Sequence, residues 1–467
     1  MVLTSTANDS VTEFDLEFQN LLLSGQSGRT VNLLAVGQPS EFIHLNGEID
    51  PLVTTTVPQD VYIAATATIP DGEFLCIGPG LNFSMYERPP SSVTITLPSP
   101  ITVTGTSMAL VLNLLVSKSA TFPNCATPAF EGYSMAPTFT LSPFTLSSSP
   151  TNSTNGKFSG LEGQIASINS DNSKFSLVVT EGPLGTRTVS VGAGSGTVFQ
   201  GISGSSALAT GMFLNMDAAL QPDGSLLATR IAVENPSAVN MMTGPVLQLP
   251  SNVTVGMIWG RQEQGPLAPG PNGTGSGYYQ SMLGLDFSNA VFQISGQLAN
   301  VQSLPFVASF NASNMVPGQN VDVSSAAFPA IGYPQANTVT LIPQTVNATV
   351  IGSSTSGAFT DYAVSLASYD LFATEAVQHP SQMEVYVDSN SQELNTQPVT
   401  PGGTFRFYGL VFNDTGTLRM DCAQVSDGVP FSTQSNASNQ MTISYVETMR
   451  RETHGGMQQV TTTIAHP

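Results

Sequence analysis

Histidine is one residue type in this sequence that could bind a metal ion or transfer protons. The chain has four histidines, at His44, His379, His454 and His466. None has a second histidine or a cysteine at the short spacing that brings two ligands to one ion. We therefore expect no metal site, no cofactor and no acid–base role for these residues.

Cysteine chemistry is confined to three positions. Cys76 and Cys125 lie in the same half of the chain and could form one disulfide in an oxidising compartment. Cys422 alternates with Leu418 and Met420 along a strand pattern, so we predict a buried free thiol there.

Ser107 stands in the peptide GTSMA, which is identical to the peptide around the nucleophile of subtilisin-like proteases. A nucleophilic serine needs a histidine base and a carboxylate that orients it. Only His44 precedes Ser107, in a peptide unlike the family's histidine motif, and Leu110-Val111 replace the Ser-Pro that follows in the family. We interpret the peptide as a turn before a buried strand and keep a serine hydrolase using Ser107 as an alternative function.

A long loop interrupts the predicted first hairpin of a repeat in the second half of the chain. It runs from Gly260 to Gly277, with Trp259 and Arg261 at its entry and Tyr278 and Tyr279 at its exit. Long loops in compact domains are often functional, and aromatic rings stack on flat or sugar-like ligands. These four residues are the predicted ligand-binding site; the alternative is that core aromatics flank a simple insertion.

The composition limits the partners. Charged residues are 9% of the 467, against roughly 25% in typical soluble domains. Twelve basic and 32 acidic residues give a formal net charge of -20, which repels phosphate backbones, so we expect no nucleic-acid partner. Because charged residues are few, the polar surface must consist mainly of hydroxyl and amide side chains. Such a surface is common in extracellular β proteins, so we predict an extracellular β protein.

Short alternating runs predict strands over the first 120 residues. VTEFDLEF at 11–18 places Phe14, Leu16 and Phe18 on one face, and similar runs follow, for example at 61–69 and 108–116. Such a density of strands favours a β-sandwich. From residue 157 a five-strand unit recurs every 80 to 105 residues, with turn-and-closing-strand segments such as DGSLLATRI at 223–231 and DTGTLRMDC at 414–422. This spacing favours small barrels in series.

Two resemblances accompany these patterns. Residues 42–69 resemble a transthyretin-like sandwich domain of unknown function at the start of bacterial surface lipoproteins, although the family's Pro-x-Gly-x-Tyr motif lacks its glycine at Pro58–Tyr62. The repeats resemble an OB-like domain of unknown function that recurs in tandem in secreted bacterial proteins. The resemblances imply a secreted or cell-surface protein that could carry a lipid anchor upstream of Met1. Residues 1–10 have neither the basic start nor the apolar stretch of a signal peptide, so either a signal segment absent from this chain was removed, which the composition and fold favour, or the protein stays in the cytoplasm.

The predicted fold class is all-β, an N-terminal β-sandwich followed by three tandem OB-like barrel modules. The predicted boundaries are 10–120 for the sandwich, 121–156 for a Pro/Ser/Thr-rich linker, 157–238, 239–343 and 344–430 for the modules, and 431–467 for a C-terminal extension. We predict a non-enzymatic spacer or a binder of extracellular polysaccharide; an envelope assembly adaptor with an envelope protein as partner is a further alternative.

Overall fold

The structure of the chain is a computed structural model that describes residues 1–5, 11–43, 49–78, 82–87, 91–105, 107–121, 134–144, 157–180, 186–233, 240–248, 255–264, 280–295, 301–325, 333–367, 370–376, 380–394, 398–428, 445–447 and 460–462. Strands dominate these residues, which confirms the all-β class. Where described, no helix is both long and apolar enough to cross a membrane.

The N-terminal unit packs three sheets around one hydrophobic core. The first has the strand order β15-β12-β1-β6 and contains β15 (Phe139–Phe144), β12 (Ala109–Leu114), β1 (Val2–Ser5) and β6 (Asp50–Pro51). The second has the order β10-β7-β3-β4, with β11 also paired to β7, and contains β10 (Ser91–Ile95), β7 (Asp60–Ile69), β3 (Asn20–Gly25), β4 (Thr30–Asn32) and β11 (Ile101–Val103). The third has the order β5-β2-β8-β9 and contains β5 (Gln38–Glu41), β2 (Val11–Phe18), β8 (Asp71–Gly78) and β9 (Asn82–Glu87).

Part of the predicted linker belongs to this unit. The short helix α1 (Val116–Ser119) leads into β13 (Ala120–Thr121), which pairs with β14 (Ser134–Met135), and β15 then pairs antiparallel with β12. Phe139 and Leu141 are fully buried in the core with Phe18 and Phe42. The boundary at 121 was wrong because the Pro/Ser/Thr content of 121–156 hides an alternating strand, FTLSPF, whose apolar face completes the core.

The first module is a closed five-stranded barrel, hereafter barrel 1. Its strand order is β16-β17-β18-β20-β19, with β16 (Lys157–Ile168), β17 (Lys174–Thr180), β18 (Thr186–Gln200), β19 (Phe213–Leu220) and β20 (Leu226–Val233), and a 3-10 helix at Ser205–Ala207. The third strand runs parallel to the fifth, and the other pairs are antiparallel. This is the predicted OB-like barrel.

Module 2 has the same order of pairing with a broken third strand. Its sheet order is β23-β22-β21-β25-β26-β24, with β21 (Asn240–Gln248), β22 (Val255–Gln264), β23 (Gln280–Asp286), β24 (Val291–Ile294), β25 (Asn320–Ser325) and β26 (Ala336–Leu341), and a 3-10 helix at Val301–Ser303. β23 pairs with β22, β24 runs parallel to β26, and a single bridge joins Asp286 to Gln335 at the break. The pair β23 and β24 thus replaces the continuous β18 of barrel 1, so this module is not the closed barrel predicted.

The third module is again a closed barrel, hereafter barrel 3. Its order is β27-β28-β29-β31-β30, with β27 (Gln344–Ser356), β28 (Phe359–Leu366), β29 (Gln382–Leu394), β30 (Thr404–Asp414) and β31 (Thr417–Asp427). The helix α2 (Leu371–Glu375) lies between β28 and β29. In the C-terminal extension, β32 (Tyr445–Glu447) pairs with β33 (Val460–Thr462).

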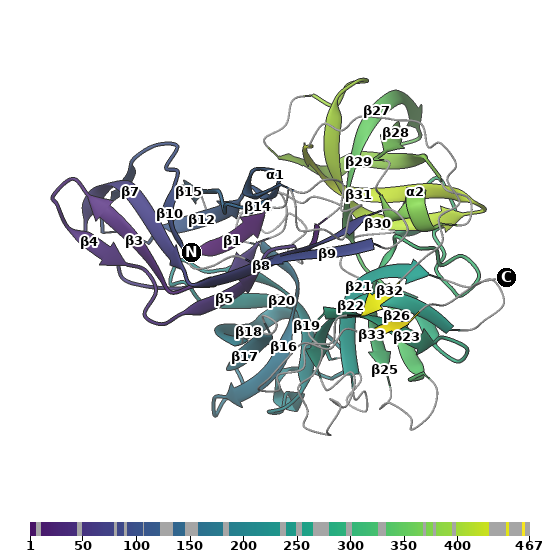
Figure 1. Cartoon of the computed structure of the whole chain (residues 1–467). Coiled ribbons are helices and arrows are strands. Elements are labelled where there is room, and N and C mark those ends of the chain that lie inside the picture. The colour runs from purple at the N-terminus through teal and green to yellow at the C-terminus, as the bar shows by residue number, and fades with distance from the viewer. Residues whose placement is uncertain are drawn as a thin grey trace.

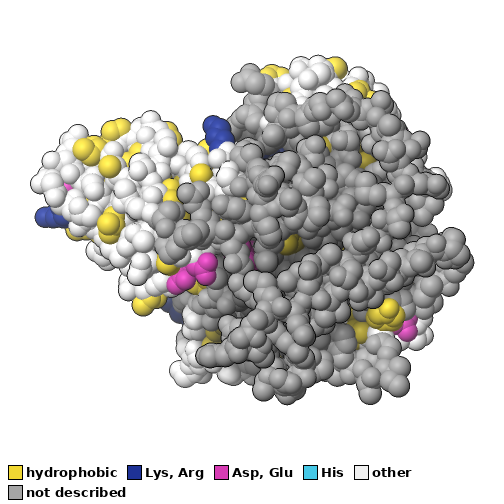
Figure 2. All heavy atoms as spheres, viewed as in Figure 1, with side chains coloured by type: hydrophobic (Ala, Val, Ile, Leu, Met, Phe, Trp, Pro, Cys, Tyr) yellow, Lys and Arg dark blue, Asp and Glu magenta, His cyan; other side chains and the backbone are white. Residues whose placement is uncertain are grey.

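The modules contact one another at specific places. Figure 1 shows the N-terminal unit beside barrel 1, and module 2 beside barrel 3. Arg187 of β18 forms a buried ion pair with Asp50 of β6, and Val2 and Ile49 pack into the barrel 1 core. Among the described side chains on the face in Figure 2, charged groups are isolated within a mainly neutral surface, as the composition predicted.

Candidate functional site

The backbone register of module 2 aligns one set of positions across its whole sheet. By register, neighbouring strands place opposite one another Gln293, Thr340, Asp322, Thr243, Arg261 and Gln280. We name these six positions the module 2 row. These positions lie on six strands that come from one stretch of about a hundred residues.

Alternation along β21, β25 and β26 places Thr243, Asp322 and Thr340 on the outside of the module. Its flanking residues Met242, Val321, Val323, Val339 and Leu341 are buried in the module core. Successive strand residues point to opposite faces, so the positions between them lie on the outside. Thr243, Asp322 and Thr340 are half-buried, and Gln293 is exposed.

Hydrogen bonds link neighbours within the row. The Gln293 Nε2 donates to Thr340 Oγ1 at 2.8 Å, and the Thr243 hydroxyl donates to Asp322. Amides, hydroxyls and a carboxylate side by side offer donors and acceptors to a hydroxyl-rich ligand.

An exposed aromatic ring packs on β23 four residues along the strand from the Gln280 position of this row. Tyr333 is 58% exposed, and its ring packs on Gly284 of β23 so closely that a methyl group added at Gly284 would collide with it. On the paired strands β22 and β23, Gly284 is opposite Met257. Two residues further along each strand, Met282 is opposite Trp259. Tyr333 therefore lies on the same side of the sheet as the positions of Trp259 and Arg261.

The structure places only part of the predicted site. Trp259 and Arg261 lie in β22, and Tyr278 and Tyr279 lie outside the described residues. The predicted loop bounds were wrong: β22 continues to Gln264, and the connection from 265 to 279 joins the second strand to the third rather than interrupting the first hairpin. The physical reason is that Arg261 pairs with strands on both sides, with Thr243 and with Gln280, so its backbone is held in the sheet.

The predicted site residues did not include Gln293, Thr340, Asp322, Thr243 or Tyr333. The alternation in NVDVSS and NTVTL does predict that Asp322 and Thr340 point away from the core. The strand pairing that aligns these two residues with Arg261 cannot be recognised from the local sequence.

The corresponding outer face of barrel 3 is covered by a segment of module 2. The ring of Phe306 lies 5.0 Å from that of Tyr386 and 5.7 Å from that of Phe412, measured between centroids. The Arg419 guanidinium stands 5.6 Å from the Phe306 centroid and pairs with Glu384 (3.0 Å) and Asp414 (3.2 Å). Burial and the hydrogen bond that its hydroxyl donates to Glu384 raise the pKa of Tyr386 to about 12.

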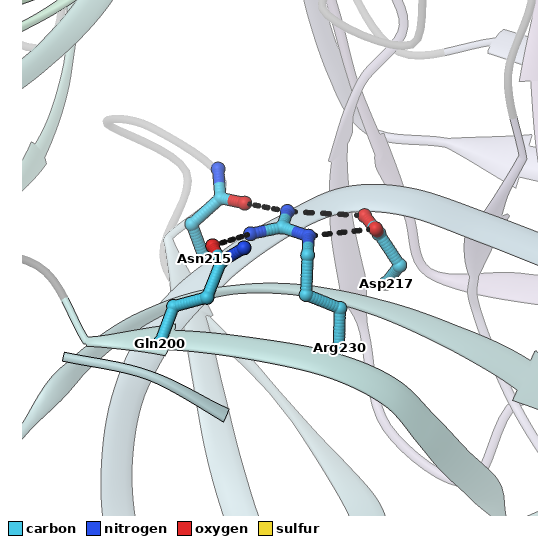
Figure 3. A network of polar contacts seen from close by, with 4 residues as sticks. All are labelled: Gln200, Asn215, Asp217 and Arg230. Carbon is cyan, nitrogen blue, oxygen red and sulfur yellow. Dashed lines mark hydrogen bonds and ion pairs between the residues drawn. The ribbon is translucent and has the colours of Figure 1, made fainter. Parts of the chain in front are cut away.

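Barrel 1 carries a polar network on the outside of β18, β19 and β20 (Figure 3). Arg230 donates from Nε to Asp217 at 2.8 Å, from Nη2 to Asn215 at 2.5 Å, and from Nη1 to Gln200 at 3.4 Å. The charge of Arg230 is neutralised by Asp217, and its side chain is only 12% exposed. This arrangement is suited to holding three strands together rather than to binding a ligand.

The remaining predicted residues lie apart from this site. Cys76 is disulfide-bonded, while Cys125 lies outside the described residues. Cys422 is a buried free thiol, and burial raises its pKa to about 12. Ser107 is exposed just before β12, and His44 lies outside the described residues. No group of three or more His, Cys, Asp or Glu in the described parts of the chain could hold a metal ion.

A comparison with known protein families gives a match for one module of the chain. Residues 162–232 match a family model described as a domain of unknown function, DUF5666. The match spans barrel 1 from within β16 to within β20, so one barrel corresponds to one family domain. No curated protein matches the chain.

Proposed function

We propose that this chain is a non-enzymatic, secreted or cell-surface protein that binds an extracellular polysaccharide on the outside of module 2. The observation that carries the proposal is the exposed Tyr333 ring packed on Gly284 of β23, a strand that the module 2 row also crosses. Sugars are bound by aromatic rings that stack on their apolar faces and by polar groups that bond their hydroxyls. Both kinds of group lie on one side of this sheet.

The shape of the site favours an extended ligand. The row follows the curved sheet around the module from β24 through β26, β25, β21 and β22 to β23, with neighbouring strands about 4.8 Å apart. A polymer of several sugar units could follow it. The low charge of the chain favours a neutral polymer over an anionic one, which the net charge of -20 would repel.

A spacer function is compatible with the contacts between modules. Gln319 of module 2 donates to the Val411 carbonyl oxygen of barrel 3 at 2.8 Å, and the Arg187–Asp50 pair joins barrel 1 to the sandwich. Such contacts restrict the angles between neighbouring modules. Binding and projection from a cell surface are therefore parts of one proposal.

Binding can be tested by co-sedimentation of the whole chain with cellulose, chitin and peptidoglycan. We expect retention on at least one polymer, and a loss of at least tenfold in affinity for Tyr333→Ala and for Arg261→Ala. Gly284→Val should have the same effect as Tyr333→Ala because the added side chain displaces the ring.

The matched control is Ile351→Ala, an exposed apolar residue on β27 of barrel 3, which should bind like the parent. If no polymer retains the parent, or if Tyr333→Ala binds equally well, the module 2 site is rejected and the spacer function alone remains.

A further inference from the structure

The contact between module 2 and barrel 3 contains carboxyl groups in an apolar setting. Phe306 and Phe310, from the connection between β24 and β25, form one buried cluster with Tyr386, Leu410 and Phe412 of barrel 3. Phe306 is only 8% exposed. The connection is anchored nearby, since the Gly318 carbonyl accepts a hydrogen bond from Gln344 at 2.8 Å.

Two aspartates flank the centre of this contact. By register, Tyr386 is opposite Asp361 on β28 and opposite Asp421 on β31, and Asp421 is in turn opposite Leu410 on β30. Tyr386 and Leu410 both belong to the cluster that module 2 covers. Asp421 therefore lies between two residues that the Phe306 segment shields from water.

The other charged groups on this face are predominantly acidic. β29 contributes Glu384 and Asp388, β30 contributes Asp414, and β31 contributes Arg419. The neighbouring position on β27 is Ser354, which donates to Asp361 at 3.4 Å. Residues 301–318 of the covering segment contain no ionisable side chain. Nothing on that segment compensates the charge of the carboxylates it covers.

We propose that the contact of the Phe306 segment with barrel 3 is a pH-dependent latch, closed in mild acid and loosened when Asp361 and Asp421 ionise. Covering a carboxylate with apolar side chains disfavours its charged form. Protonation of the two aspartates therefore favours the closed contact, and by linkage the closed contact favours protonation. This inference does not rest on the proposed polysaccharide site.

The electrostatics of the two groups agree with this geometry. Burial, with the nearby Asp388 charge, raises the pKa of Asp421 to about 6. Burial, with the nearby Glu384 charge, also raises the pKa of Asp361. For an acid whose pKa is raised in the closed state, stabilisation is complete below its ordinary pKa near 4 and is lost as pH rises through about 6. The latch should thus loosen between pH 4 and pH 7.

Hydrogen exchange of the 301–318 amides in the whole chain tests the latch, with protection factors corrected for intrinsic exchange. Between pH 5 and pH 8 we expect protection in the parent to fall about tenfold, less than the full pKa shift implies because solvent screens part of it. In the double variant Asp361→Asn/Asp421→Asn, the protection of the 301–318 amides at both pH values should equal that of the parent at pH 5. Phe306→Ala should lower protection at both, which shows that the measurement reports the contact.

Asp223→Asn is the matched control, because Asp223 is an exposed aspartate in a turn of barrel 1. It should leave the pH dependence of 301–318 unchanged. If parent protection is the same at pH 5 and pH 8, or if the pH dependence persists in a folded Asp361→Asn/Asp421→Asn chain, the latch is refuted. Circular dichroism checks that each variant is folded. If the double variant does not fold, the single variant Asp421→Asn replaces it. We expect this single variant to halve the logarithm of the change in protection between pH 5 and pH 8.

Discussion

Barrel 1 and barrel 3 share a strand order but are joined to their neighbours by different chemistry. Each carries an arginine on the outside of its fifth strand. In barrel 1, Arg230 is enclosed by Gln200, Asn215 and Asp217 of its own barrel (Figure 3). In barrel 3, Arg419 shares its charge between two acids and also lies over Phe306 of module 2.

The difference shows that the barrel fold leaves its outer face free to acquire separate roles. Barrel 1 is attached to the sandwich through the buried Arg187–Asp50 pair and apolar residues. Barrel 3 is attached to module 2 through an aromatic cluster on its side. Module 2 keeps Tyr333 exposed on its outside, which is why we place ligand binding there.

The largest effect should come from the barrel 1 attachment. Arg187→Leu leaves Asp50 buried without its cation, and removing one partner of a buried pair costs about 3–5 kcal/mol of unfolding free energy. Urea unfolding followed by circular dichroism at pH 7 measures it. Arg187→Leu/Asp50→Leu should recover most of the loss; a loss in the double variant equal to the sum of the losses in the two single variants would show that the pair is not coupled.

The second-largest loss of stability should come from changes at the contact between barrel 3 and module 2. Phe306→Ala removes a buried ring from the cluster and should cost about 3 kcal/mol, against about 1 kcal/mol for Phe306→Leu, which keeps most of the apolar volume. The same urea titration measures both. If Phe306→Leu costs as much as Phe306→Ala, the aromatic contacts with Tyr386 and Phe412, rather than the buried volume, account for the loss.

Replacing each outer arginine by lysine sharpens the comparison of the two barrels. Both variants lose the planar fork of hydrogen bonds, so we expect each to cost about 1 kcal/mol. Arg419→Lys should cost roughly 0.5 kcal/mol more than Arg230→Lys because lysine stacks less well on the Phe306 ring. Paired thermal melts measure the difference, and a larger loss for Arg230→Lys would contradict the assigned roles.

The smallest effect on stability should come from Tyr333→Ala. An exposed ring in the connection before β26 contributes little to folding, so we expect a change within about 0.5 kcal/mol. The same variant should lose polysaccharide binding. A loss of stability above about 2 kcal/mol would instead make Tyr333 a structural residue.

Much of the fold could be predicted because alternation is a local property. The strand at Val11–Phe18 coincides with its predicted run, and Val61–Ile69 lies within β7. The closing strands after Asp223-Gly224 and Thr415-Gly416 were also predicted from their turns. β15 was missed, since Pro143 and neighbouring serines gave its segment the composition of a linker.

The candidate site could be predicted only in part. A lone tryptophan and an arginine near a glycine-rich stretch directed attention to Trp259 and Arg261. Gln293, Asp322 and Thr340 carry no such signal, and Tyr333 becomes notable only because its ring lies on Gly284.

By itself, the sequence determined the all-β class, the strands and the serial modules, because side chains that alternate between core and solvent are specified residue by residue. Only the tertiary structure decided which strands are neighbours, and so which polar residues form the module 2 row and which barrel 3 residues Phe306 contacts. The physical reason is that burial and the pKa of Asp421 depend on groups brought together across long separations, on which local spacing has no bearing.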